Sequence, residues 1–250
     1  MINLKVSKSV FPNTFTCLNV FSGFLSIVMA SQNEIFYASY LIAAAAVFDA
    51  LDGIVARFTG SSSKFGVELD SLADVVSFGA APAFLIYASY LKDLGWIGIV
   101  VSSFQLVMGA LRLARFNTDL KGFDKTYFSG LPIPFAALTI ASFLIFHYDE
   151  SAGFSPLMEA FVVPLVISLG LLMVSKIKFD TLPKFTSDEI RNKPVYHVFT
   201  VIAFLTVLIS KGSLLFFILV SVIVFSIIRY IKNFFFNGPD ENIGLNNETH

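Results

Sequence analysis

The chain reads FDALDGIVARFTGSSSKFGVELDSLAD from Phe48 to Asp74, and four aspartates stand in this stretch between long apolar runs. An ionised carboxylate inside a bilayer costs a few kcal/mol or more, so such a group needs a partner and indicates a functional site. The chain around it is 56% hydrophobic and only 14% charged, with a mean hydropathy of +0.76. Soluble domains carry about 25% charged residues, so this composition is typical of a membrane protein.

Apolar runs near the length of a membrane span recur along the whole chain and predict an all-α, polytopic helix bundle. We expect about eight spans, at residues 13–30, 36–58, 66–91, 95–115, 131–148, 157–175, 196–210 and 213–231. They form a single membrane domain over residues 1–232. The remaining segment, 233–250, is rich in Asn, Gly and Asp and is predicted to be disordered.

The positions of the basic residues predict the orientation of the bundle. With the N-terminus in the cytoplasm, every Lys and Arg except Lys92 and Lys211 falls on the cytoplasmic side. An even number of spans returns the C-terminus to that side. We therefore expect an integral protein of the inner cell membrane whose acidic stretch lies near the cytoplasmic surface, with no nucleic-acid partner.

The spacing of the aspartates predicts that their side chains converge. Asp49 and Asp52 are i,i+3 on one helix, and Asp70 and Asp74 are i,i+4 on the next, so each pair shares a face. The linker 59–65 is short, which makes the two helices antiparallel neighbours. At a rise of ~1.5 Å per residue, both pairs lie roughly 6–13 Å from the cytoplasmic ends of their helices.

A set of carboxylates without Cys or His favours hard divalent cations: Mg²⁺, Mn²⁺ or Ca²⁺. Two such ions would balance the four negative charges, and two-metal carboxylate centres are a common means of handling phosphate groups. Small residues beside the acids, Gly53, Ala56 and Gly66, would let a bulky ligand approach the helices, or would serve helix packing. An ion transporter is the alternative, but its acids would be spread along a path, whereas these share one depth.

The stretch contains the pattern Asp49-x2-Asp52-Gly53-x2-Ala56-Arg57-x8-Gly66-x3-Asp70-x3-Asp74. At all eight fixed positions it resembles the signature of the CDP-alcohol phosphotransferase family. The resemblance implies an integral membrane enzyme, a homodimer, that transfers a phosphoalcohol from a CDP-linked donor to an alcohol and releases CMP.

The resemblance also implies a role for each signature residue. Asp49, Asp52 and Asp70 would hold the metals, with Asp70 bridging them. Asp74 would bind the second metal and act as the general base. The CDP-binding residues would be Asp52, Gly53, Ala56, Arg57 and Gly66.

Further motifs are similar to those of family members that use CDP-diacylglycerol as donor and L-serine as acceptor. They are FPNTFTCLNVFSGF (11–24), SFGAAPA (77–83), LRLARFN (111–117) and FSGLPIP (128–134). Glycerol 3-phosphate and an inositol phosphate are the alternative acceptors. A phosphorylated acceptor would need more basic residues near the site than Arg112 and Arg115, which favours serine.

Several residues outside the signature are candidate ligand contacts with simpler structural alternatives. Arg112 and Arg115 are i,i+3 and could bind the lipid phosphate or the serine carboxylate, or could only orient the helix in the membrane. Lys64 could reach a phosphate or remain a solvated loop charge. Asn13 and Thr16 could touch the nucleotide or cap the first helix.

Overall fold

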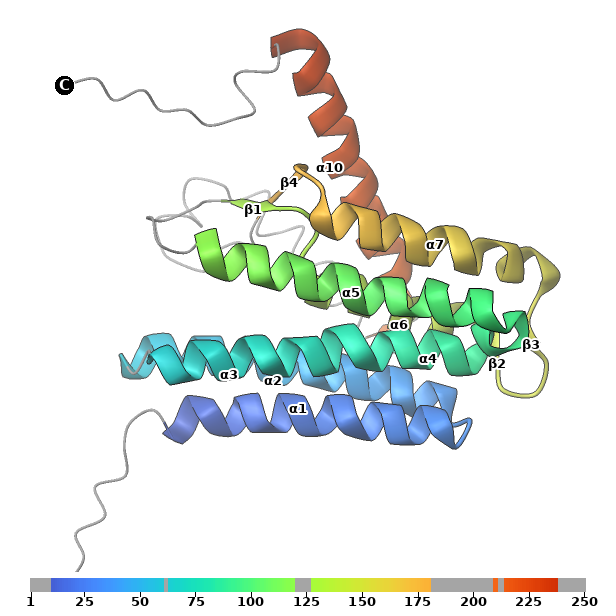
Figure 1. The fold of residues 1–250 in the computed structure, drawn as a ribbon, viewed down its shortest axis with the longest axis horizontal. Coiled ribbons are helices and arrows are strands. Elements are labelled where there is room, and N and C mark those ends of the chain that lie inside the picture. The colour runs from blue at the N-terminus through green and yellow to red at the C-terminus, as the bar shows by residue number, and fades with distance from the viewer. Residues whose placement is uncertain (1–9, 61–62, 120–126, 181–208, 211–213, 238–250) are drawn as a thin grey trace, which may run out of the picture.

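The computed structural model describes residues 10–60, 63–119, 127–180, 209–210 and 214–237, and these fold mainly into helices (Figure 1). In chain order the helices are α1 (Val10–Ser31), α2 (Ile35–Thr59), α3 (Lys64–Asp74), the π-helical η1 (Val75–Ala80), α4 (Ala81–Ser89), the 3₁₀ turn η2 (Leu91–Leu94), α5 (Trp96–Asp119), α6 (Ile133–His147), α7 (Pro156–Val174) and α10 (Leu215–Asn237).

Two short antiparallel ribbons, absent from the sequence prediction, join the helices. One pairs β1 (Tyr127–Ser129) with β4 (Lys178–Asp180), and the other pairs β2 (Tyr148–Asp149) with β3 (Gly153–Phe154). The first ribbon connects the segment after α5 to the segment after α7. Gly130 adopts φ 84°, a conformation that favours glycine, and its N–H donates to the Ile177 carbonyl at 2.9 Å.

The helices lie where the apolar runs predicted them, but the count of eight spans is not confirmed. Among the described residues, five helical segments are long and apolar enough to cross a membrane: α1, the rod Lys64–Ser89, α5, α7 and α10. Helix α6 is apolar but shorter. The predicted span 196–210 lies almost wholly outside the described residues. Helix α10 continues to Asn237, so it includes the first residues of the predicted tail, and 238–250 lie outside the described residues.

The connection between α2 and α3 makes these helices antiparallel. Gly60 ends α2 at φ 58° and donates its N–H to the carbonyls of Ala56 and Arg57. Ser63 caps the start of α3 by accepting a hydrogen bond from the Gly66 N–H at 3.0 Å. One helix therefore stops and the next begins within a few residues, as the short linker predicted.

Helix α3 continues through η1 into α4 as one rod, and the π-helical turn lies directly after Asp74. The Ala81 N–H bonds to the Val76 carbonyl, five residues earlier. Pro82 has no N–H and its ring would crowd the carbonyl four residues earlier, so a widened turn lets the helix continue through the proline.

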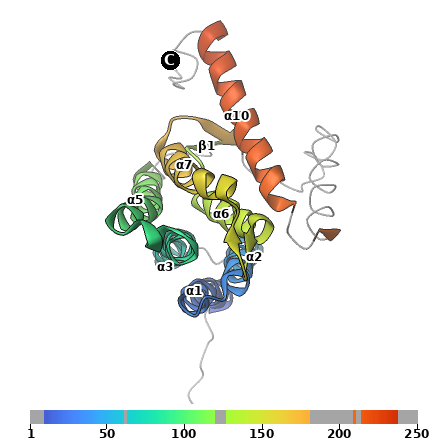
Figure 2. The same ribbon diagram turned by 90° about the vertical axis from the view of Figure 1, so that its right-hand side faces the viewer.

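The start of α1, the end of α2, the start of α3, the end of α5 and the β1–β4 ribbon lie at one end of the bundle, on the left of Figure 1. The core lies between α2, α4, α6 and α7 and is built from small, branched and aromatic side chains, including Ile42, Phe78, Leu85, Ile140 and Val166. Helix α10 packs on α6 and then leaves the bundle at a steep angle (Figure 2).

Candidate metal centre and adjoining pocket

Three of the four aspartates form a tight cluster between α2 and α3. Carboxylate oxygens of Asp49, Asp70 and Asp74 all lie within 4.8 Å of one another. Asp74 is 8% exposed, and the other two are half-buried. The antiparallel pairing of the two helices thus produces the predicted convergence for three of the four aspartates.

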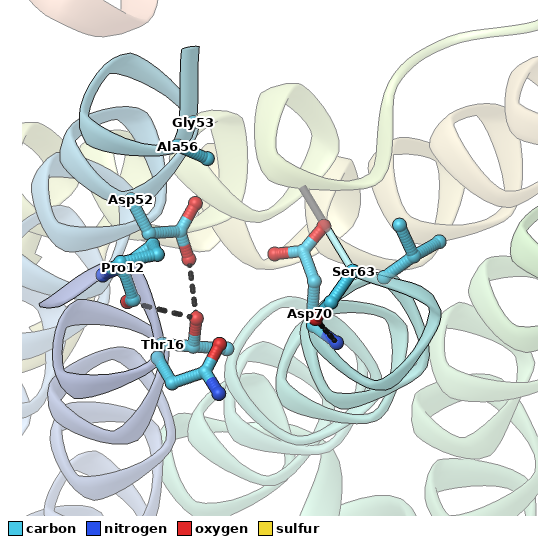
Figure 3. A pocket seen from close by; sticks show the side chains of 10 residues that line it. Pro12, Thr16, Asp52, Gly53, Ala56, Ser63 and Asp70 are labelled. Atoms are coloured by element: carbon cyan, nitrogen blue, oxygen red, sulfur yellow. Dashed lines mark hydrogen bonds between the residues drawn. The ribbon is translucent and has the colours of Figure 1, made fainter. Parts of the chain in front are cut away.

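Asp52 has a different environment from the other three aspartates. It is buried, and its Oδ2 accepts a hydrogen bond from the Thr16 hydroxyl on α1 at 2.8 Å. The same hydroxyl lies 3.3 Å from the Pro12 carbonyl, but its single proton can serve only one acceptor at a time. Asp52 is therefore held by α1, and its carboxylate faces that of Asp70 across the pocket in Figure 3.

A cavity of about 120 Å³ opens beside the cluster. It is lined by residues of α1, α2 and α3 together with the α3 cap: Pro12, Asn13, Thr16, Asp52, Gly53, Ala56, Ser63, Gly66, Val67 and Asp70. Six of the predicted CDP-binding residues are among them. Arg57 is not, and its side chain is exposed.

The glycines keep the pocket open. A Cβ on Gly66 would lie 3.2 Å from the Ser63 hydroxyl and 3.3 Å from Asn13 Oδ1, while a Cβ on Gly53 would meet only Arg57 Nη1, at 3.6 Å. A larger side chain at Gly66 would therefore fill the space between α1 and the start of α3. The space beside these small residues is compatible with ligand access, one of the two roles that the sequence left open.

Pro12, Ser63 and Val67 are pocket residues that the sequence reasoning missed. Ser63 carried a usable signal, because a serine directly before a helical run is a typical N-cap. Pro12 lies within the motif 11–24 but was not singled out, and Val67 carried no signal. Pro12 reaches the pocket because α1 crosses the α2–α3 pair at this level, and Val67 lies on α3 directly after Gly66.

The two predicted ligand-binding arginines have separate environments. Arg112 is 6% exposed, its guanidinium lies 5.6 Å from the Phe116 ring centroid, and it is close enough to Asp74 for their charges to attract. Arg115 instead donates to the Val174 carbonyl at 3.0 Å and the Ser175 carbonyl at 3.4 Å, at the C-terminal end of α7. Arg115 thus fits the role of a helix-end cation. Lys64 is the exposed first residue of α3.

The acidic cluster fits a divalent cation. Asp70 Oδ1 and Asp74 Oδ1 are buried and have no hydrogen-bond partner in the part of the chain that the structure describes. Buried carboxylate oxygens without donors are costly unless a cation binds them. Clustered carboxylate oxygens are also the ligands that Mg²⁺, Mn²⁺ and Ca²⁺ prefer.

Comparison with known proteins connects this geometry to a family. The profile of the family described as CDP-alcohol phosphatidyltransferase matches residues 9–179. The chain is 39% identical over 179 residues to a CDP-diacylglycerol–serine O-phosphatidyltransferase of Helicobacter pylori, covering 70% of this chain and 73% of that one. It is 37% identical over 220 residues to the enzyme of the same name in Methanocaldococcus jannaschii, covering 87% and 92%. An archaetidylserine synthase of Methanothermobacter thermautotrophicus is 42% identical over 170 residues, covering 67% and 68%.

Proposed function

Because the chain belongs to the CDP-alcohol phosphatidyltransferase family, we propose that it transfers the phosphatidyl group of CDP-diacylglycerol to the hydroxyl of L-serine, giving phosphatidylserine and CMP. The observation that carries this proposal is the cluster of Asp49, Asp70 and Asp74 beside a pocket lined by four further signature residues, Asp52, Gly53, Ala56 and Gly66. The serine acceptor is supported by the names of relatives that align over most of their length.

We assign the metal ligands to Asp49, Asp52, Asp70 and Asp74, with two divalent cations, Mg²⁺ or Mn²⁺ and alternatively Ca²⁺, as the cofactors. Asp70 would bridge them, since it belongs both to the cluster and to the pocket lining. When bound, the cations supply positive charge that stabilises the pyrophosphate and the developing charge of the reaction.

The pocket receives the CDP group of the donor. Gly53, Ala56 and Gly66 leave room against the helices, and Asn13 and Thr16 offer polar side chains from α1. Arg57 is exposed and its Nη1 would lie 3.6 Å from a Cβ on the pocket residue Gly53, so it would lie near the nucleotide. The acyl chains of the donor remain in the membrane beside the apolar helices.

Asp74 is the residue to which we assign the proton step. A serine hydroxyl is a weak nucleophile and needs a base within hydrogen-bond reach. Asp74 accepts the hydroxyl proton, the serine oxygen bonds to the phosphorus that carries diacylglycerol, and the bond to the CMP oxygen breaks. Arg112 lies near Asp74 and would orient the serine carboxylate or the lipid phosphate.

The chain is an integral membrane protein. We propose eight spans with both termini in the cytoplasm, a site that faces the cytoplasm from the inner membrane, and a homodimer. The distribution of Lys and Arg supports the orientation. The end of α5, which contains Arg112 and Arg115, and β4, which begins at Lys178, lie at the site end of the bundle (Figure 1). Lys92 belongs to η2, which joins the far end of α4 to the start of α5.

The acceptor is tested by offering purified protein CDP-diacylglycerol with labelled serine, glycerol 3-phosphate or an inositol phosphate. We expect label in lipid only with serine, one CMP released per lipid formed, and no product after the divalent cations are chelated. Incorporation of a phosphorylated alcohol in place of serine would contradict the acceptor assignment. Undiminished turnover in the chelator would contradict the metal centre.

The different environments of the two arginines give a second prediction. Arg112→Lys should raise the KM for serine by about tenfold, because an ammonium cannot form the planar fork that binds a carboxylate. Arg115→Lys should leave that KM unchanged and lower the stability by about 1–2 kcal/mol through lost bonds to the α7 carbonyls. Serine kinetics and thermal unfolding of both variants measure these effects. If Arg115→Lys raised the KM for serine more than Arg112→Lys did, Arg115 rather than Arg112 would be the residue that binds the serine carboxylate.

A further inference from the structure

Asn19 on α1 is a buried amide that the proposed reaction does not use. Its side chain is 0% exposed, and neither Nδ2 nor Oδ1 has a hydrogen-bond partner among the described residues. Leaving a buried amide unsatisfied costs about 1–3 kcal/mol, so polar groups of this kind are usually paired. Asn19 also belongs to the motif 11–24, two polar members of which, Asn13 and Thr16, line the pocket.

The register between α1 and α2 puts Asn19 and Asp49 at the same level of the helix pair. Thr16 bonds to Asp52, and farther along the same pair the Ser26 hydroxyl donates to the Ala38 carbonyl at 2.8 Å, so the helices run antiparallel. Asn19 is three residues after Thr16, and Asp49 is three residues before Asp52. A step of three residues moves about 4.5 Å along a helix, and because α1 and α2 are antiparallel the two steps go in the same direction in space. Residues three apart also lie on the same face of a helix, so Asn19 shares a face of α1 with Thr16, and Asp49 shares a face of α2 with Asp52.

The other side of Asn19 is fixed to the turn that follows Asp74. The Ser77 hydroxyl donates to the Asn19 backbone carbonyl at 2.9 Å. Gly23 makes this approach possible, because a Cβ there would lie only 2.6 Å from the Ser77 Cα. Asn19 is thus held between α2 and η1, one helical turn deeper in the bundle than the pocket residue Thr16.

We propose that Asn19 is a positioning residue of the metal centre, and that its Nδ2–H donates to the Asp49 carboxylate, directly or through one water, when a divalent cation is bound. The inference rests on the metal centre proposed above. A carboxylate that ligates a metal is itself oriented by hydrogen bonds, and removing such a partner typically costs about 10–100-fold in metal affinity. Thr16 already bonds to Asp52 in this way, and Asn19 would do the same for Asp49.

The test uses two substitutions of equal size, Asn19→Thr and Asn19→Val, in the purified full-length protein. Threonine keeps a donor whose reach matches that of Thr16 across the same helix pair, whereas valine removes the donor. Mn²⁺ affinity is measured directly by titration, without turnover. We expect Asn19→Thr to bind Mn²⁺ within about threefold of the wild type and Asn19→Val to bind about tenfold more weakly than Asn19→Thr.

Equal Mn²⁺ affinities in the two variants would overturn the proposal, whether or not both are weakened. Ser26→Ala is the matched control, because it removes a buried hydroxyl from the same face of α1 at a deeper position. Ser26→Ala should leave Mn²⁺ affinity unchanged. If its Mn²⁺ affinity fell as far as that of Asn19→Val, the cause would be a loosened α1 and the proposal would be overturned. A wild type without saturable Mn²⁺ binding would instead defeat the metal centre itself.

Discussion

Asp74→Asn is expected to lower kcat by about a thousandfold, since general base catalysis typically contributes about 10²–10⁴-fold. The amide keeps the size of the carboxylate but cannot accept the serine proton. Donor binding should change little, because Asp74 is not among the residues that line the pocket. Turnover with labelled serine measures the first effect, and equilibrium binding of CDP-diacylglycerol measures the second.

Glu68→Gln is the matched control for this variant. It makes the same chemical change on the same helix, α3, but at an exposed position. It should keep both turnover and binding. If Asp74→Asn retained more than about a tenth of the wild-type kcat, Asp74 could not be the general base.

The sequence predicted the described helices from long apolar runs, and residues that end a helix mark some of the breaks between them. Gly60 and Ser63 are an example, since they stop α2 and cap α3 within the short linker that the spacing identified. The π-helical turn at Val75–Ala80 was not predicted, because it depends on how the rod accommodates Pro82 against its neighbours. The β1–β4 ribbon joins segments about fifty residues apart, and no local pattern in three-residue strands indicates that pairing.

Side-chain spacing predicted the acidic site, but not the different environments of the four aspartates within it. The i,i+3 and i,i+4 rules place each pair of aspartates on one face, and the structure brings Asp49, Asp70 and Asp74 together. The separate environment of Asp52 depends on Thr16, and therefore on where α1 crosses α2. Arg115 likewise bonds to carbonyls at the end of α7, a partner that its own helix does not reveal.

Asp70→Asn should have the widest effect of the single acidic substitutions. Asp70 is the cluster residue whose side chain also lines the pocket, so it joins the metal ligands to the donor site. Replacing a charged ligand by an amide removes a negative charge that the cations need. We expect Mn²⁺ affinity to fall by more than about a hundredfold, which exceeds the loss typical of a residue that only supports a ligand.

The comparison with Asp74→Asn separates the roles of the two residues. Both variants should lose turnover, but Asp70→Asn should also lose CDP-diacylglycerol binding that depends on the divalent cation, whereas Asp74→Asn should keep most of it. Titrations of Mn²⁺ and of the donor on both variants measure this difference. If Asp70→Asn bound Mn²⁺ within about threefold of the wild type, Asp70 would not bridge the cations, and the proposed link between the cluster and the pocket would be wrong.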